Sequence, residues 1–344
     1  MAYFLSKVLL QNIWHINMKY PSISICIPTF NESKNIDRCL TSIFGKKYAG
    51  LLDIMIVDGG STDDTIKKAK KYNVRILKNP DKYAEIGKKI GLLQAKGEYF
   101  MLIDCDMDLV GNHWFEKLIQ PLLEDQSIVG SWPMYKAIAS DTLLNKFITI
   151  HPLQLDPIFE FLTASYTSCL VKQTNSYDIL EYTERKMLPS GFCLYRKKQL
   201  LSSSIMKIQR FMENDNVVLL MRDGLKKYAV PYGISFHHPT LLSLKHLMMK
   251  RIRNLNTMYF NQPDKRYWTW IDWNKKVDVL KICIWLFYTY TLLPSIVVGI
   301  WKCMKQGNLS GMYELPVNLI TTTAVIREFI KNREGRKLLF SSLK

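Results

Sequence analysis

The stretch that decides the fold spans residues 99 to 108 and reads Tyr99-Phe-Met-Leu-Ile-Asp104-Cys-Asp106-Met-Asp108. Its apolar run ends abruptly in acidic residues. A second strand-like stretch, residues 53–57, is apolar from Ile54 onward and likewise ends in Asp58 and a Gly-Gly-Ser-Thr turn. Two buried strands that deliver carboxylates at their C-terminal ends predict a sheet that holds a ligand over its carboxyl edge. Asp104 and Asp106 are candidates to bind a divalent cation, Mg2+ or Mn2+, that carries a diphosphate.

Strands and helices alternate through the first half of the chain. We expect strands over residues 23–27, 53–57, 74–77 and 99–103, and helices over 35–44, 65–72 and 83–95. This alternation predicts an α/β fold with a mainly parallel, doubly wound sheet. A less regular middle part is followed by an expected strand over 192–195, a helix over 216–222 and a strand over 228–230.

The charge balance is strongly basic, with a formal net charge of +17 over 344 residues. Such a balance indicates a polyanionic partner, for example nucleic acid, anionic lipid or a phosphate-rich substrate. The last 104 residues hold 17 Lys and Arg against 6 Asp and Glu, so much of the excess lies beside the most apolar part of the chain. None of the seven cysteines forms a Cys-x-x-Cys pair, which favours buried thiols in a reducing compartment over a disulfide framework or a zinc site.

The C-terminal part contains a candidate membrane segment. Residues 282–301 carry no charge, and a helix of this length spans about 30 Å, one hydrocarbon core. Pro294 would kink it, which membrane helices tolerate. The alternative is a buried core helix. A second apolar stretch, residues 315–326, is shorter and predicts a re-entrant or interfacial segment. The lysines that precede residue 282 predict that the α/β part of the chain lies on the cytoplasmic face.

Residues 244–253 separate apolar and basic side chains onto different faces of a predicted helix. This pattern is typical of a helix at an anionic membrane surface, and packing on the core is the alternative. The chain therefore divides into an N-terminal apolar segment (1–20), an α/β domain (21–240) and C-terminal interfacial and membrane-anchoring helices (241–344).

Three motifs together resemble glycosyltransferase family 2, whose members have the GT-A fold. They are residues 27–32 (Ile-Pro-Thr-Phe-Asn-Glu), residues 57–65 (Val-Asp-Gly-Gly-Ser-Thr-Asp-Asp-Thr) and residues 95–106, which end in the Asp-x-Asp. The resemblance covers roughly residues 22 to 240. It implies that Asp58 contacts the nucleotide base and that Asp104 and Asp106 bind the metal. The nucleotide-sugar site that it implies is formed by Pro28, Thr29, Asn31, Glu32, Asp58, Gly60, Ser61 and Asp104.

The resemblance extends, less closely, to the acceptor side. The family has a Glu-Asp pair whose Asp acts as the base, whereas here Glu213 is followed by Asn214 and then by Asp215. Asp215 is therefore the favoured candidate for the base, and Glu213 is the alternative. His238 could complete the metal shell, with a hydrogen-bonded loop histidine as the alternative. Lys88 lies where the family often has a residue near the diphosphate, and a solvated lysine is the alternative there.

These features predict a membrane-associated, metal-dependent inverting transferase. It would move a sugar from a nucleotide sugar, expected to be UDP-linked, to a lipid-linked saccharide held at the membrane. An alternative is transfer directly to a polyprenyl phosphate, which needs no base because that nucleophile is already ionised. A distant alternative is a basic nucleic-acid-binding protein, but the sequence contains no RNP motif, zinc-finger spacing or P-loop.

Overall fold

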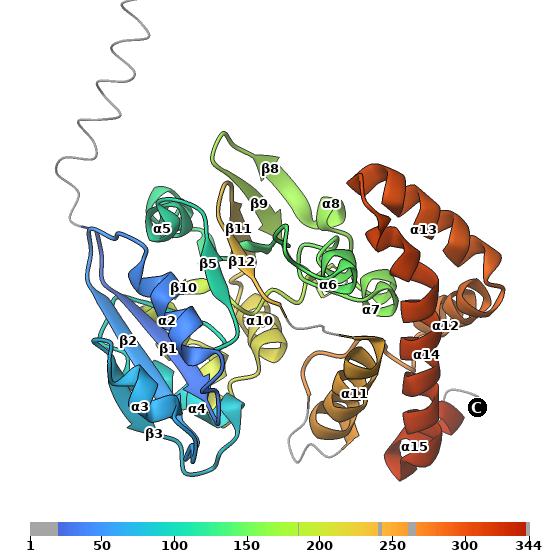
Figure 1. Ribbon diagram of the computed structural model, residues 1–344, viewed down its shortest axis with the longest axis horizontal. Helices are drawn as coiled ribbons and strands as arrows, with labels where there is room; N and C mark the ends of the chain where they lie inside the picture. The colour runs from blue at the N-terminus through green and yellow to red at the C-terminus, as the bar shows by residue number, and fades with distance from the viewer. Residues whose placement is uncertain (1–19, 185, 240–242, 261–265, 342–344) are drawn as a thin grey trace, which may run out of the picture.

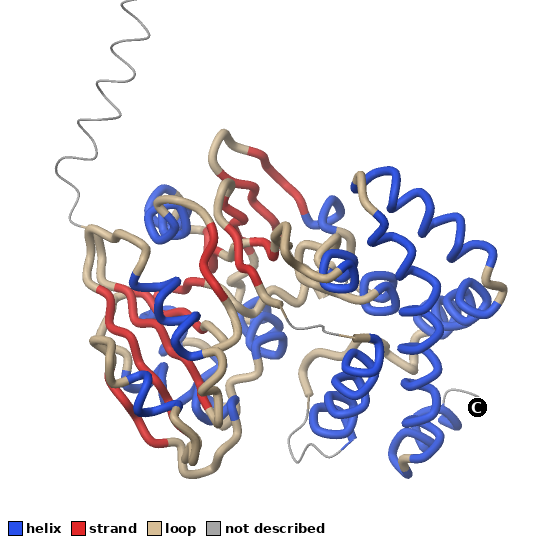
Figure 2. The backbone as a smooth tube through the Cα atoms, in the orientation of Figure 1, coloured by secondary structure: helices blue, strands red, loops and turns tan. Residues whose placement is uncertain are grey.

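The computed structural model describes residues 20–184, 186–239, 243–260 and 266–341. The N-terminal apolar segment expected over residues 1–20 lies outside this description except for Tyr20. The β-sheet elements occupy one side of the molecule, and the C-terminal helices gather on the other (Figures 1 and 2).

The first half follows the alternation expected from the sequence, and each expected element is present within a few residues. Its elements are β1 (Ile23–Thr29), α2 (Ile36–Phe44), β2 (Leu52–Asp58), α3 (Thr65–Ala69), β3 (Arg75–Lys78), α4 (Ala84–Gln94) and β4 (Tyr99–Leu102).

The middle part adds short strands and helices. They are β5 (Asp108–Val110), α5 (Trp114–Glu124), β6 (Ile128–Ser131), β7 (Met134–Tyr135), α6 (Leu143–Ile148), α7 (Pro157–Leu162), α8 (Tyr166–Cys169), β8 (Leu170–Gln173), β9 (Tyr177–Glu181), β10 (Leu194–Arg196), α9 (Lys197–Ser202), the 3-10 helix η1 (Ser204–Lys207), α10 (Glu213–Arg222), β11 (Lys227–Pro231) and β12 (Ser235–His237). The helix expected over 216–222 thus begins three residues earlier, so Glu213 lies in its first turn.

The main sheet has nine strands in the order β3-β2-β1-β4-β10-β6-β11-β9-β8. The prediction of a mainly parallel sheet is wrong for the second half. Strands β1 to β4 pair in parallel, but β10 is antiparallel to both β4 and β6, and β9 is antiparallel to β11 and β8. The strand that lies beside β4 therefore comes from a distant part of the chain, which delivers a new loop to the carboxyl edge of β4.

Helices cover both faces of this sheet. Alternate residues of β1 point to opposite faces, so Ile25 and Ile27 pack with α2 and α5, whereas Cys26 packs with α4 and α10. A three-stranded sheet, β5-β12-β7, lies at the carboxyl edge of β4 and brings the end of β12 beside the start of β5. Both sheets thus place polar residues on one edge.

The C-terminal part is helical. It contains α11 (Leu244–Leu255), the π-helix η2 (Asn256–Phe260), α12 (Lys276–Tyr290), α13 (Leu293–Gln306), the 3-10 helix η3 (Leu309–Tyr313), α14 (Glu314–Lys331) and α15 (Arg333–Ser341). The amphipathic helix expected over 244–253 is α11. Its Leu247 is fully buried with Phe147 and Val317. One face of α11 therefore packs on the rest of the protein, which was the alternative to a helix at a membrane surface.

The uninterrupted span expected over residues 282–301 is broken into α12 and α13. Within the described part of the chain, no single helix is both long and apolar enough to cross a bilayer. The pair α12–α13 meets the criteria only jointly, across an 80° bend. Pro294 lies in the first turn of α13, where its missing N–H is harmless, and Leu292 adopts a positive φ of 62° just before it. The proline thus starts a new helix rather than bending a continuous one.

Candidate active site

Asp58 ends β2 and shapes the turn that follows it. Its carboxylate accepts hydrogen bonds from the Gly60 N–H at 3.1 Å and from the Ser61 hydroxyl at 2.6 Å. Gly60 has a φ of +87°, which a side chain disfavours, so glycine suits this turn. Parallel pairing of β1 with β2 and β4 places Asp58 on the same sheet edge as the residues that follow β4.

The loop after β1 is tied to this turn. The Asn31 N–H donates to Ser61 Oγ at 2.9 Å, and the Asn31 side chain accepts from the Thr62 N–H at 2.9 Å. Thr29 is buried, and its hydroxyl donates to the backbone of Ile27.

Glu32 follows in the same loop, and burial raises the pKa of its carboxyl. The carboxylate of Asp106 adds to that rise, which shows that the β1 loop and the Asp-x-Asp share one electrostatic environment. The predicted nucleotide residues on this side, Pro28 included, thus come together at the ends of β1 and β2.

Lys88 of α4 links two carboxylates across the cleft. Its ammonium is buried, pairs with Glu213 and lies 3.8 Å from Asp104 Oδ1. Burial, together with the nearby carboxylates of Asp106 and Glu213, raises the pKa of Asp104 to about 6 despite the charge of Lys88. A buried group of like charges of this kind favours the binding of a cation.

Asp106 contacts His238, which follows β12. His238 Nε2 lies 3.0 Å from Asp106 Oδ2. Burial alone would raise the pKa of Asp106, but the hydrogen bond and charge of His238 lower it to about 2. The predicted partners Asp106 and His238 thus lie in direct contact.

Gln154 fixes the orientation of the His238 ring. The Gln154 amide nitrogen donates to the His238 carbonyl at 3.1 Å, so its oxygen faces His238 Nδ1 at 2.8 Å. An amide oxygen only accepts, so Nδ1 carries a proton. Nε2 of the same ring faces Asp106 Oδ2, and a divalent cation bound there would replace the proton that lies between them, leaving Nε2 as a ligand and the Nδ1 proton on Gln154, the arrangement of a metal-ligating histidine.

The donor set fits a divalent cation that the substrate helps to bind. Adjacent ligands of an octahedral ion with bonds of ~2.1 Å lie ~3.0 Å apart, which is the observed separation of His238 Nε2 and Asp106 Oδ2. No group of three or more His, Cys, Asp or Glu side chains in the described ranges is already arranged around one point. The predicted three-ligand set of Asp104, Asp106 and His238 is therefore not formed, and phosphate oxygens would have to complete the shell.

A second network, formed by charged side chains, holds Asp106 and His238 in place. The sequence alone did not predict it. Arg38 of α2 pairs with Asp108 and donates to the Asp106 carbonyl at 3.0 Å. His237 bridges Asp108 Oδ2 at 3.2 Å and Asp141 Oδ1 at 2.9 Å. Asp108 starts β5, and its contact with His237 joins that strand to β12.

The two candidate bases differ in their surroundings. Glu213 faces Lys88 and the Asp104 carboxylate in the cleft. Asp215 is almost fully buried and accepts from Arg266 Nε at 2.7 Å and from the Trp268 N–H at 2.9 Å. Its carboxylate therefore anchors the segment that follows α11, whereas the Glu213 carboxylate shares the cleft with the metal candidates.

A cavity of about 150 Å³ lies beside Asp104 and His238. Its far wall comes from α11, which contributes Lys250 and Arg251. Arg251 is held by the buried Asp156 at 2.6 Å. Burial and the charge of Arg251 lower the pKa of Lys250, against the effect of Asp106. The sequence showed basic residues on this helix but not that Lys250 faces the cleft.

Comparison with known proteins identifies the family. The family model described as Glycosyl transferase family 2 matches residues 24–198, just over half of the chain. The chain belongs to glycosyltransferase family 2. The mixed α/β sheet and the acidic carboxyl edge of this glycosyltransferase agree with that membership.

Individual relatives match only parts of the chain. Glycosyltransferase GlyG of Streptococcus pneumoniae is 31% identical over 121 residues, which are 33% of this chain and 40% of GlyG. The Methanococcus voltae protein named dolichyl N-acetyl-alpha-D-glucosaminyl phosphate 3-beta-D-2,3-diacetamido-2,3-dideoxy-beta-D-glucuronosyltransferase is 36% identical over 88 residues, 23% of this chain and 27% of that protein. The chain thus spans less than half the length of either relative.

Among solved structures, TarS of S. aureus superposes with a TM-score of 0.45 at 16% identity. The match covers 72% of this chain and 41% of TarS.

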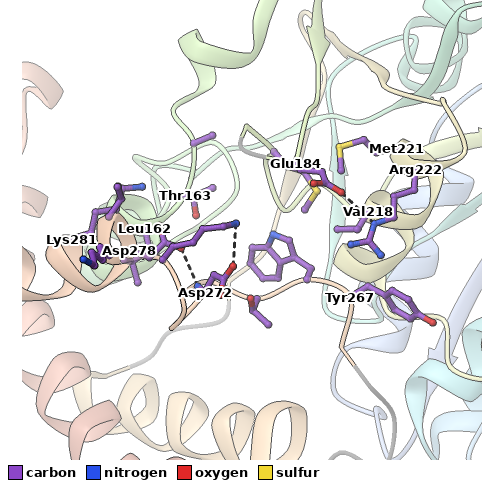
Figure 3. Close-up of a pocket in the computed structure, with 17 residues that line it drawn as sticks. Leu162, Thr163, Glu184, Val218, Met221, Arg222, Tyr267, Asp272, Asp278 and Lys281 are labelled. Atoms are coloured by element: carbon purple, nitrogen blue, oxygen red, sulfur yellow. Dashed lines mark hydrogen bonds and ion pairs between the residues drawn. The ribbon is translucent and has the colours of Figure 1, made fainter. Parts of the chain in front are cut away.

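A larger cavity of the glycosyltransferase, about 730 Å³, lies between α10 and α12 (Figure 3). The Arg222–Glu184 pair, 3.6 Å apart, lies at one end of it, and Asp278 and Lys281 lie at the other. None of the predicted site residues lines it. We therefore assign the chemistry to the smaller cavity, where the acidic side chains gather.

Proposed function

We propose that this glycosyltransferase moves a sugar from a nucleotide sugar, with UDP as the expected nucleotide, to a hydroxyl of a lipid-linked saccharide. The catalytic half would lie on the cytoplasmic face of a membrane. The observation that carries the proposal is the group of Asp104, Asp106, His238, Lys88 and Glu213 at one sheet edge, in a chain of this family.

The ends of β1 and β2 would hold the nucleoside. The turn after Asp58 and the linked loop at Asn31 form a rigid polar rim because each uses its side chain to fix the other. A pre-formed rim of this kind loses little conformational freedom when it binds a ligand. Lys88 lies between this rim and the acceptor side, where its charge would attract the diphosphate.

Asp106 and His238 would hold Mn2+ or Mg2+, with Asp104 close by. An imidazole nitrogen beside carboxylates favours Mn2+, since Mg2+ prefers oxygen ligands. Such an ion, when bound, would neutralise negative charge on the leaving diphosphate.

Glu213 is the base that the geometry favours over Asp215. It would accept the proton of the acceptor hydroxyl while the new C–O bond forms at the anomeric carbon and the bond to the diphosphate breaks. A single displacement of this kind inverts the configuration, as the family resemblance implies. Asp215 could act only after it releases Arg266 and the Trp268 backbone.

The lipid-linked acceptor rests on two kinds of support. The C-terminal helices expose many apolar side chains, described below. The Methanococcus voltae relative is named for a dolichyl-linked sugar phosphate. A base in the cleft favours a hydroxyl acceptor over a bare polyprenyl phosphate, which has no proton to lose.

The test is a screen of nucleotide sugars for hydrolysis by the full chain with Mn2+. Asp106→Asn is expected to lower the rate at least a hundredfold, whereas Asp64→Asn, which changes an exposed acid beyond the β2 turn, leaves it unchanged. Full activity of Asp106→Asn would refute the metal role. With membrane extract as the acceptor source, Glu213→Gln should abolish transfer, and near-normal transfer would point to a phosphate acceptor.

A further inference from the structure

The C-terminal helices expose many large apolar side chains. On α13 these residues follow the spacing of one helix side, and further ones lie on α12 and η3. We call this set the apolar face: Val277, Leu280, Ile284, Phe287, Leu293, Ile296, Val297, Ile300, Trp301, Met304, Leu309 and Met312. Met304 is 78% exposed and Phe287 69%. Exposed apolar surface on this scale indicates an interaction site.

The inner side of the same helices is polar and tightly paired. Lys302 of α13 is buried, with its ammonium 2.8 Å from Glu314 Oε2 and 3.7 Å from Glu160 Oε2 of α7. The other oxygen of Glu314 accepts from the Tyr288 hydroxyl at 2.8 Å and from Asn318 at 3.1 Å. One buried carboxylate thus joins α12, α13 and α14, and Lys302 joins them to the catalytic body.

Close backbone contact reinforces this arrangement. A Cβ on Gly311 would lie 2.2 Å from the Gly299 carbonyl oxygen, so only glycine allows η3 and α13 to approach this closely.

These contacts oppose a transmembrane arrangement of α12 and α13. At 1.5 Å per residue each helix is about 22 Å long, short of the roughly 30 Å hydrocarbon core. To cross a bilayer, the pair would have to straighten its 80° bend and withdraw Lys302 from Glu314 and Glu160. Unpaired charges are strongly disfavoured in hydrocarbon.

We propose that the apolar face lies in one leaflet of an anionic bilayer and that α12 and α13 do not cross it. Lys276 opens α12 and Lys305 lies in the last turn of α13, so a lysine flanks the exposed apolar residues at each end of the pair, which suits anionic headgroups. Lys305 lies 4.9 Å from the centre of the Trp301 ring, and both side chains are typical of the headgroup depth. This inference rests on the proposed membrane-bound acceptor and specifies how the enzyme reaches it.

The first experiment measures partition of the purified full chain onto vesicles, with and without anionic lipid. Binding is expected to need anionic lipid. Replacing Ile300 and Met304 together with Glu should weaken it at least tenfold. The control is Leu51→Glu, which makes the same chemical change at a 78% exposed leucine on the sheet side and should leave binding unchanged. Nucleotide-sugar hydrolysis should be equal in all three proteins.

The second experiment distinguishes a leaflet from a span. Single cysteines replace Lys275 and Gln306, just outside the two ends of the pair, after Cys283 and Cys303 are changed to Ser. Inside-out membrane vesicles from expressing cells are then treated with an impermeant maleimide. Both positions should react without detergent. Reaction at only one of them until detergent is added would overturn the inference in favour of a span.

Two other outcomes are equally decisive. If the protein does not bind vesicles but hydrolyses the donor, the membrane mode fails while the transferase chemistry stands. If the Ile300 and Met304 changes abolish a concentration-dependent dimer and vesicles are not bound, the apolar face is a contact between two copies of the chain.

Discussion

Replacing Gly191 with Ala should displace the proposed base without touching it chemically. Gly191 lies in the loop before β10, against the first turn of α10. A Cβ added there would lie 1.9 Å from Glu213 Cβ and 2.7 Å from Glu213 Cα. An ordinary contact between carbon atoms is 3.4 Å or more, so the loop and the helix must separate by about 1.5 Å.

The size of the effect follows from this displacement. A misplacement of about 1 Å in a catalytic group costs about a hundredfold in rate, equivalent to about 2.7 kcal/mol of activation free energy. Overpacking should also lower the free energy of unfolding by about 1–3 kcal/mol. We therefore expect Gly191→Ala to fold and to hydrolyse the donor about a hundredfold more slowly, with little change in the affinity for UDP.

The assay is donor hydrolysis at saturating Mn2+, with UDP affinity from calorimetry. The matched control is Gly224→Ala, beyond the other end of α10. Gly224 has a φ of +87° but open space around it, so the variant should lose a similar 1–2 kcal/mol of stability without moving Glu213. If Gly191→Ala keeps a rate within threefold of the wild type, or if both variants slow equally, the positional role of Gly191 is refuted.

Three further predictions concern buried charges. Arg251→Met leaves Asp156 unpaired and should lower the free energy of unfolding by about 3–5 kcal/mol in urea titrations; adding Asp156→Asn should recover most of that loss, and no recovery would contradict the pairing. Burial, then the charge of Lys302, lowers the pKa of His151 from 6.5 to about 4. The contribution of the neutral His151 to the free energy of unfolding is therefore fully present above pH 6.5 and is lost as the pH drops towards 4. Between pH 7 and pH 5 this histidine alone should cost about 2 kcal/mol, so in urea titrations at the two pH values the wild type should lose about 2 kcal/mol more stability than His151→Gln does, and an equal change in the two proteins would contradict the role of His151. Lys88→Met removes the ammonium between Asp104 and Glu213 and should lower the free energy of unfolding by about 3 kcal/mol in the absence of metal. Mn2+ with UDP should raise the melting temperature of this variant more than that of the wild type. An equal rise would contradict a shared role of the lysine and the metal ion.

The sequence predicted the first half of the fold well because its signals are local. Each expected element from residue 23 to residue 103 is present within a few residues, since hydrophobic runs and their polar ends report directly on strands and helices. The pairing of β10 between β4 and β6 depends on contacts between distant segments, which periodicity does not encode. The sheet was therefore expected to be more parallel than it is.

The candidate site was predictable where it follows a strand end. Asp58 ends β2 and Asp106 follows β4, and both strands are parallel neighbours of β1. The order of the strands along the chain is enough to predict that these two residues share one edge of the sheet. Gln154 and Lys250 were not predicted to act there because their roles arise only when an irregular middle segment and α11 fold back over β4. Proline at position 294 was recognised as a disturbance, but whether it bends one helix or starts another depends on the packing beneath it.

Helix α11 has a practical consequence for anyone who wishes to shorten this enzyme. A cut at residue 240, where the catalytic part was expected to end, would delete the wall that Lys250 and Arg251 give to the cavity beside Asp104 and His238. The same cut would remove Arg251, which pairs with the buried Asp156. A shorter chain that keeps α11 but lacks α14 would expose Leu247, which packs against Val317 of α14. Shortened versions of the enzyme should therefore keep the C-terminal helices, because these helices complete the cavity and the packing beside Asp104 and His238.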